Sequence, residues 1–90
     1  MKTAQEFREI AIKEMSTPDM LEAARLIETL MFDAINKGKS YISLNTGFAT
    51  FRDLCDLAKG YDNLKTYLEL HGYTVGTSSF DCISFFTVSF

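Results

Sequence analysis

Residues 82–90 are the stretch that most constrains how this 90-residue chain folds. The run is Cys82-Ile83-Ser84-Phe85-Phe86-Thr87-Val88-Ser89-Phe90, and its β-branched and aromatic residues are typical of a strand. Ile83 and Phe85 fall on one face, whereas Phe86, Val88 and Phe90 fall on the other. The pattern therefore predicts either a bulge at Phe85-Phe86 or a strand that is covered on both faces. We favour a central strand of a small sheet, because burial on both faces gives unbroken apolar runs. The alternative is that one face, or an exposed edge, docks another chain.

A short helix precedes this region. Asp62 is placed to cap it, because its carboxylate can accept hydrogen bonds from the free N–H groups of the first turn. Leu64, Leu68 and His71 recur at helical spacing, and Gly72 can end the helix with a positive φ. We expect a helix over residues 62–71.

The helix leads into a hairpin. Residues 73–75 (Tyr-Thr-Val) begin a strand, and residues 76–79 (Gly-Thr-Ser-Ser) have the composition of a turn. The second strand is then the apolar run, which predicts a hairpin whose second strand is the longer.

Two helices open the chain. Thr3 and Glu6 have the spacing of a capping box, which predicts a first helix to about Met15. Thr17 and Pro18 then have the residue types that favour the cap and the first position of a second, longer helix.

The second helix has an unusually wide apolar face. A face of this width needs cover on more than one side, from the first helix, the sheet or a second subunit. Its residues are Met20, Leu21, Ala23, Ala24, Ile27, Leu30, Met31, Phe32, Ala34 and Ile35.

The middle of the chain predicts one strand and one helix. Lys37-Gly38 ends the second helix, residues 40–44 read as a short strand, and Lys59-Gly60 ends a third helix. The residues that this helix should turn inward are Phe51, Leu54, Cys55 and Ala58. We therefore expect one α+β domain over residues 1–90, with four helices and a three-stranded antiparallel sheet in the order ααβααββ.

Composition narrows the class of protein. The chain is 47% hydrophobic with eight Phe, which disfavours disorder, and its formal charge of −3 disfavours nonspecific binding to nucleic acid. No apolar run is long enough to span a bilayer, and we find no signal peptide. Cys55 and Cys82 are expected to be buried thiols rather than a disulfide. These features predict a soluble, cytoplasmic protein without a membrane partner.

From the second helix onward, the element order resembles that of a winged-helix domain. In such a domain the helix over residues 62–71 would lie in the major groove of DNA, with the turn that follows it as the wing. The cations for this role are Lys37, Lys39 and Lys65, yet no Lys or Arg follows Lys65. Because DNA contacts need several cations on one surface, we keep DNA binding as an alternative only.

No set of side chains points to catalysis. His71 is the only histidine, and we expect it to be a partly buried structural imidazole at a helix end. Cys55 lies on an apolar face without a group to orient it, and Asp53 and Asp56 are a weak metal signal that is typical of a solvated face. We therefore expect no enzyme, no metal and no cofactor.

Aromatic residues are the stronger signal, since tyrosine and phenylalanine are enriched in protein interfaces. They gather in the last helix and hairpin, and together they predict a protein-binding surface. The candidate residues are Tyr67, Tyr73, Phe80, Phe86 and Phe90.

Residues 34–44 and 64–75, followed by the final strand, resemble a layout found in small accessory proteins of bacteriophages. The shared features are a helix, Asn36-Lys37-Gly38-Lys39, a strand and a helix end of the type LxxLGYxV, in which His71 stands where Leu is usual. The resemblance implies a protein that acts by binding, such as a host-takeover inhibitor, an anti-defence protein or a virion part. It transfers no site residue.

We therefore expect a non-enzymatic protein that binds a host protein and inhibits it. A winged-helix DNA-binding protein is the alternative, and a small structural component of the virion is a second alternative. A homodimer is a further expectation, formed through either the wide second helix or the C-terminal strand.

Overall fold

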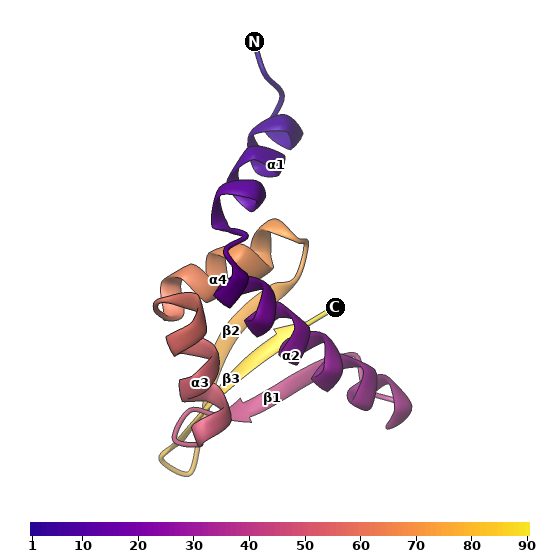
Figure 1. Cartoon of the computed structure of the whole chain (residues 1–90). Coiled ribbons are helices and arrows are strands. Elements are labelled where there is room, and N and C mark those ends of the chain that lie inside the picture. The colour runs from indigo at the N-terminus through magenta and orange to yellow at the C-terminus, as the bar shows by residue number, and fades with distance from the viewer.

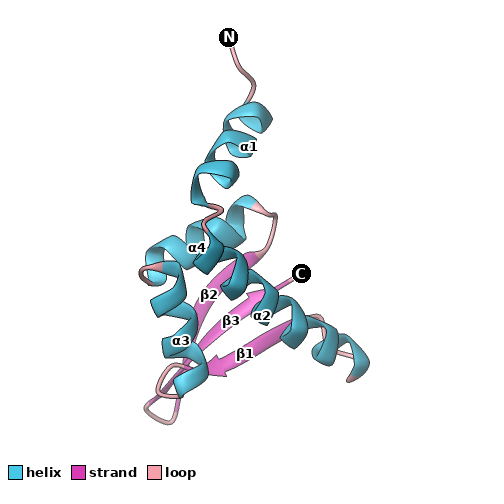
Figure 2. Ribbon diagram, viewed as in Figure 1, coloured by secondary structure: helices cyan, strands magenta, loops and turns pink.

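The computed structural model describes all 90 residues and contains four helices and one three-stranded antiparallel sheet. Figures 1 and 2 show how these elements are arranged. The expected α+β class and the order ααβααββ are confirmed. The elements are α1 (Ala4–Met15), α2 (Pro18–Asn36), β1 (Tyr41–Asn45), α3 (Ala49–Ala58), α4 (Tyr61–Leu70), β2 (Thr74–Phe80) and β3 (Ile83–Ser89).

The first two helices begin where their caps predict. The Thr3 hydroxyl accepts from the backbone N–H of Glu6, and the Glu6 carboxylate accepts in return from the backbone N–H of Thr3. Thr17 caps α2 by accepting from the N–H of Met20 at 3.1 Å. These bonds satisfy backbone N–H groups that a helix leaves free at its start. Because the bond from Thr17 starts a new helix, Ser16 and Thr17 form a short link between α1 and α2.

Helices α2, α3 and α4 pack on the same face of the sheet (Figures 1 and 2). The core lies between these two layers, and its largest fully buried side chain is that of Phe86. The Phe86 ring is centred 5.3 Å from the ring of Phe51 and 5.9 Å from that of Tyr61, so residues from α3, α4 and β3 meet at one aromatic cluster. The 14 buried residues form one cluster: Met20, Ala23, Ile27, Met31, Ala34, Ile42, Leu54, Ala58, Leu64, Tyr67, Leu68, Val75, Phe86 and Val88.

β3 is the central strand, as the sequence predicts, but its second face is not covered. The sheet order is β1-β3-β2, and both registers run without a bulge. Phe86 and Val88 face the helices, whereas Ile83 on the other face is exposed and Phe85 is half-buried. The expectation of two-sided cover is therefore wrong, because Phe85 is shielded by its neighbours within the sheet rather than by another layer.

We call the uncovered side of the sheet the open face. Alternation along the three paired strands assigns its residues, none of which carries a charge. They are Tyr41, Ser43, Asn45, Thr74, Gly76, Ser78, Phe80, Ile83, Phe85, Thr87 and Ser89.

The hairpin turn differs from the prediction. β2 continues through residues 76–79, and the chain turns at Asp81 and Cys82, so both hairpin strands have seven residues. Asp81 and Cys82 have φ of 55° and 65°, the left-handed conformation that a two-residue type I′ turn requires at both positions. Gly-Thr-Ser-Ser has the composition of a turn, but an edge strand tolerates the same residues, so the prediction of a turn at residues 76–79 is wrong.

Other local predictions also need correction. α4 starts at Tyr61 with Gly60 as its cap residue, so Asp62 lies inside the first turn and caps nothing. His71 is exposed rather than partly buried, although its ring packs edge-on against Tyr67 at 4.7 Å. Cys55 is only half-buried and Cys82 is exposed at the hairpin turn; both are free thiols.

α1 extends away from the rest of the molecule, as Figure 1 shows. It packs against α4 through its last turns, where Ile12 and Met15 are partly buried, but none of its residues is fully buried. Phe7 and Ile10 are exposed. The sequence offered the first helix as one possible cover for the apolar face of α2. In the structure α1 does not cover that face.

Candidate functional site

The main concave surface of the molecule runs along α2. Two adjoining hollows of about 260 and 300 Å³ lie between α2 and the segment that links α4 to β2, and they share Glu28, Met31 and Tyr73. We call them together the α2 groove. The residues that line it are Leu21, Ala24, Arg25, Ile27, Glu28, Met31, Phe32, Ile35, Tyr67, Leu68, His71, Tyr73 and Phe90.

The groove is mostly apolar and has no cover within the chain. Leu21, Phe32 and Ile35 on α2 are all more than half exposed. Phe90, at the end of the sheet, lines the second hollow with Phe32 and Ile35 and has 44% of its surface exposed. About 21 Å of helix axis separates Leu21 from Ile35. Monomeric proteins rarely leave large contiguous apolar patches uncovered, so this surface is typical of an interaction site.

Two charged residues of α2 line the groove. Glu28 belongs to both hollows, and Arg25 lines the first. Arg25 is held by Glu22, with its Nη2 2.6 Å from one carboxylate oxygen and its Nε 3.1 Å from the other. These hydrogen bonds lower the pKa of the Glu22 carboxyl. Glu28 has no such partner among the ion pairs of the chain, which leaves a carboxylate at the centre of the groove.

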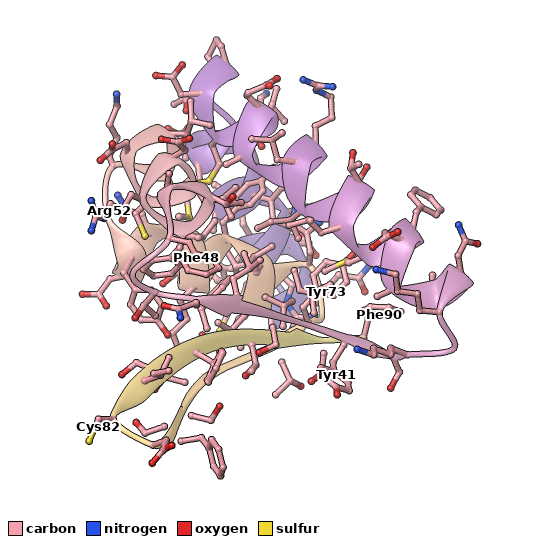
Figure 3. All side chains as sticks on the ribbon, turned by 90° about the horizontal axis from the view of Figure 1, so that it is seen from below. Tyr41, Phe48, Arg52, Tyr73, Cys82 and Phe90 are labelled. Carbon is pink, nitrogen blue, oxygen red and sulfur yellow. The ribbon has the colours of Figure 1, made fainter.

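Three of the aromatic residues that the sequence singles out meet in this groove. Tyr73 lines both hollows, Phe90 lines the second, and Figure 3 shows them close together beneath α2. Tyr67 forms part of the floor; it is 3% exposed, and its hydroxyl lies 3.1 Å from Ser16 Oγ. A partner would thus contact Tyr73 and Phe90 directly, while Tyr67 supports the surface.

The other two aromatic candidates lie elsewhere. Phe86 is fully buried in the core, so it cannot contact a partner. Phe80 is 76% exposed but lies at the far end of the hairpin, on the open face. In a strand, neighbouring aromatic residues alternate between faces, so nearness in sequence did not bring these rings to one surface.

The α2 residues that form the wall of the groove were not among the binding residues predicted from the sequence. Leu21, Phe32 and Ile35 were counted only as part of the wide apolar face of the second helix. The width of that face was the signal that could have identified them, since a helix packed on one side leaves the excess exposed.

The three lysines of the DNA-binding alternative are not brought together. The Ser16–Tyr67 contact places the middle of α4, and with it Lys65, beside the start of α2. Lys37 follows the last residue of α2, which is 19 residues long, so the two ends lie about 28 Å apart. Lys37 also pairs with Asp33 at 3.0 Å, and the Lys39 ammonium lies 6.0 Å from the ring centre of Tyr41.

The elements that would contact DNA in a winged-helix domain present few cations. The exposed residues of α4 include Asp62 and Glu69, and the hairpin turn carries Asp81. Lys65 is half-buried. Carboxylates repel phosphates, so this surface is poorly suited to a nucleic acid. The winged-helix resemblance itself stays a prediction.

The groups that could support chemistry are dispersed. Burial, and then the charge of Asp56, raises the pKa of the Cys55 thiol, which disfavours the reactive thiolate. No three His, Cys, Asp or Glu side chains are grouped so that they could hold a metal ion.

None of the helices combines the length and the apolar character that crossing a membrane requires.

Comparisons of the chain with protein-family models, with curated protein sequences and with solved structures found no match.

Proposed function

We propose that this chain is a non-enzymatic protein-binding module, and that its partner is held in the α2 groove. The observation that carries the proposal is the exposed apolar wall of Leu21, Phe32 and Ile35 along two adjoining hollows that no segment of the chain fills. Tyr73 lines both hollows, and Phe90 lines the one that contains Phe32 and Ile35. Burying such a wall against a partner gains free energy in proportion to the apolar area removed from water.

The shape of the groove favours an amphipathic helix as the bound segment. It follows α2 for about four turns, which suits a partner helix with apolar anchors three or four residues apart. Glu28 lies midway along the groove, so a Lys or Arg of the partner would meet an opposite charge there. The two hollows are also open and near the lower end of the size range for small-molecule sites, which favours a protein partner.

The biological role that we propose rests on the resemblance to small accessory proteins of bacteriophages. On this basis the partner is a bacterial host protein, and occupation of one of its helices by the groove inhibits it. The acidic balance of the chain fits a protein partner better than a nucleic acid.

Two phenylalanines offer a matched test. Phe32 in the groove is 66% exposed, and Phe48 at the start of α3, outside the groove, is 65% exposed. The tagged protein and the variants Phe32→Ser and Phe48→Ser are used to capture proteins from bacterial lysate, with and without nuclease. The captured protein is identified by mass spectrometry, and its Kd for each variant is measured by calorimetry.

We expect one protein to be captured despite nuclease, and Phe32→Ser to weaken its binding at least about 30-fold, the effect of removing an interface hot spot. Phe48→Ser should bind like the unchanged protein. Equal binding by both variants would exclude the groove. Capture that disappears with nuclease would favour the DNA-binding alternative, and recovery as one large assembly of copies would favour the virion role.

A further inference from the structure

No strand of the chain pairs with the outer edge of β2. β2 has a strand neighbour on one side only and also contacts α4, and Figure 3 shows the turn of the hairpin, labelled at Cys82, at the border of the molecule. Its seven residues, Thr74–Phe80, include no charged residue and no proline. Charges, prolines and bulges are what normally prevent an exposed edge from pairing, and the regular register with β3 has no bulge. This edge is therefore free to accept another strand.

The backbone groups on that edge follow from the hairpin register. Phe80 and Ile83 close a two-residue turn, so they exchange hydrogen bonds with each other, and every second residue back along β2 does the same with β3. The residues between them direct their N–H and C=O groups outward. These residues are Val75, Thr77 and Ser79.

Gly76 is a second unusual feature of this strand. It lies inside β2 without a positive φ, and a Cβ built there would meet only Thr87 Oγ1 at 3.7 Å, an ordinary contact. Nothing within the chain therefore requires a glycine. A glycine inside a strand weakens it, and it commonly marks a place where a group from outside approaches closely.

We propose that two copies of this chain pair through the outer edges of β2, antiparallel and with a two-fold axis at Thr77, so that their sheets join into one of six strands. In this register all seven residues of each strand are paired. Val75 of one copy lies opposite Ser79 of the other, so the outward-directed backbone groups meet one another. The register also places Thr77 against its own copy, and a Thr–Thr pair is favourable across strands.

The side chains of the open face explain why the second strand is another copy of β2. In the same register Phe80 lies opposite Thr74 of the other copy and diagonal to its Gly76, within the reach of an aromatic ring. An aromatic ring packed over a strand glycine is a stabilising arrangement, since it shields backbone that the glycine leaves bare. The Phe80 ring, which is 76% exposed in one chain, thus packs where Gly76 of the other chain has no side chain. One sequence supplies both halves of the contact.

The test uses charge at the two-fold axis. Thr77→Lys and Thr77→Glu each place two like charges directly opposite each other, and Thr77 is exposed, so both variants should fold. Ser43→Lys adds the same charge at an exposed position of β1, away from this edge, and serves as the control. Masses are measured by light scattering after size exclusion and by native mass spectrometry, with circular dichroism as a check of folding.

We expect the unchanged protein and Ser43→Lys to have about twice the chain mass of 10.2 kDa, and each Thr77 variant to have the mass of one chain. An equimolar mixture of Thr77→Lys and Thr77→Glu should recover a dimer that contains one of each, because opposite charges then face each other. A single-chain mass for the unchanged protein up to about 0.1 mM would overturn the proposal. A dimer that survives Thr77→Lys, or a mixture that stays unpaired, would overturn it as well. The result is independent of the α2 groove, because Phe32→Ser leaves this edge untouched.

Discussion

Replacing Phe86 with alanine separates the two roles that an aromatic residue in the last strand can have. Phe86 has no exposed surface and packs against the rings of Phe51 and Tyr61 at 5.3 and 5.9 Å. Truncation of a buried phenylalanine costs about 3–5 kcal/mol, and the loss of two aromatic neighbours favours the upper part of this range, about 4–5 kcal/mol. A domain of this length has a free energy of unfolding of about 4–13 kcal/mol, so a third or more of the total is lost.

The measurement is urea unfolding followed by circular dichroism, at one protein concentration so that association does not change between samples. Phe48→Ala is the control, because Phe48 is 65% exposed and its removal should change the free energy of unfolding by no more than about 0.5 kcal/mol. A Phe86→Ala variant as stable as Phe48→Ala would refute the position of Phe86 at the centre of the core.

Two further predictions concern the cysteines. Cys82→Gly should raise the free energy of unfolding by about 1 kcal/mol in the same urea assay, because glycine adopts the left-handed conformation of this turn position without steric cost; no gain would argue against the type I′ turn. In that variant Cys55 is the one remaining thiol, and burial and then Asp56 raise its pKa. Alkylation of the folded protein by iodoacetamide should therefore keep accelerating with pH after the rate for the urea-unfolded chain has levelled, and equal pH midpoints would contradict this. At a pH between the two pKa values the unfolded thiol is ionised while the native thiol is not. The Cys55 thiol therefore stabilises the fold at lower pH, and its contribution is lost as pH rises through the folded pKa.

The sequence was most informative where one residue decides the local structure. Thr3 and Thr17 fix helix starts through single hydrogen bonds, and both starts were predicted. Prediction failed where several conformations suit the same residues. Asp62 can cap a helix or lie in its first turn. The chain has positive φ at Lys59 and Gly60, and the cap position of α4 is Gly60, two residues before the predicted cap.

The candidate site was predicted only in part. Tyr73 and Phe90 lie in the α2 groove because one residue begins the hairpin and the other ends it, and antiparallel pairing brings these ends together. No local pattern tells whether α1 folds back over α2 or extends away from it. The exposure of Phe32 depends on that choice, so the groove could be identified only from the tertiary structure.

The position of β3 between the other strands sets the order in which the sheet can assemble. β2 and β3 are joined by a two-residue turn, so they can pair early and locally. β1 pairs with β3 alone, across a loop that contains α3, α4 and the whole of β2. Closing this loop carries an entropic cost that is offset only when the two intervening helices pack at the same time. We therefore expect the joining of β1 to be the cooperative step, in which the hairpin and the helices become a single unit.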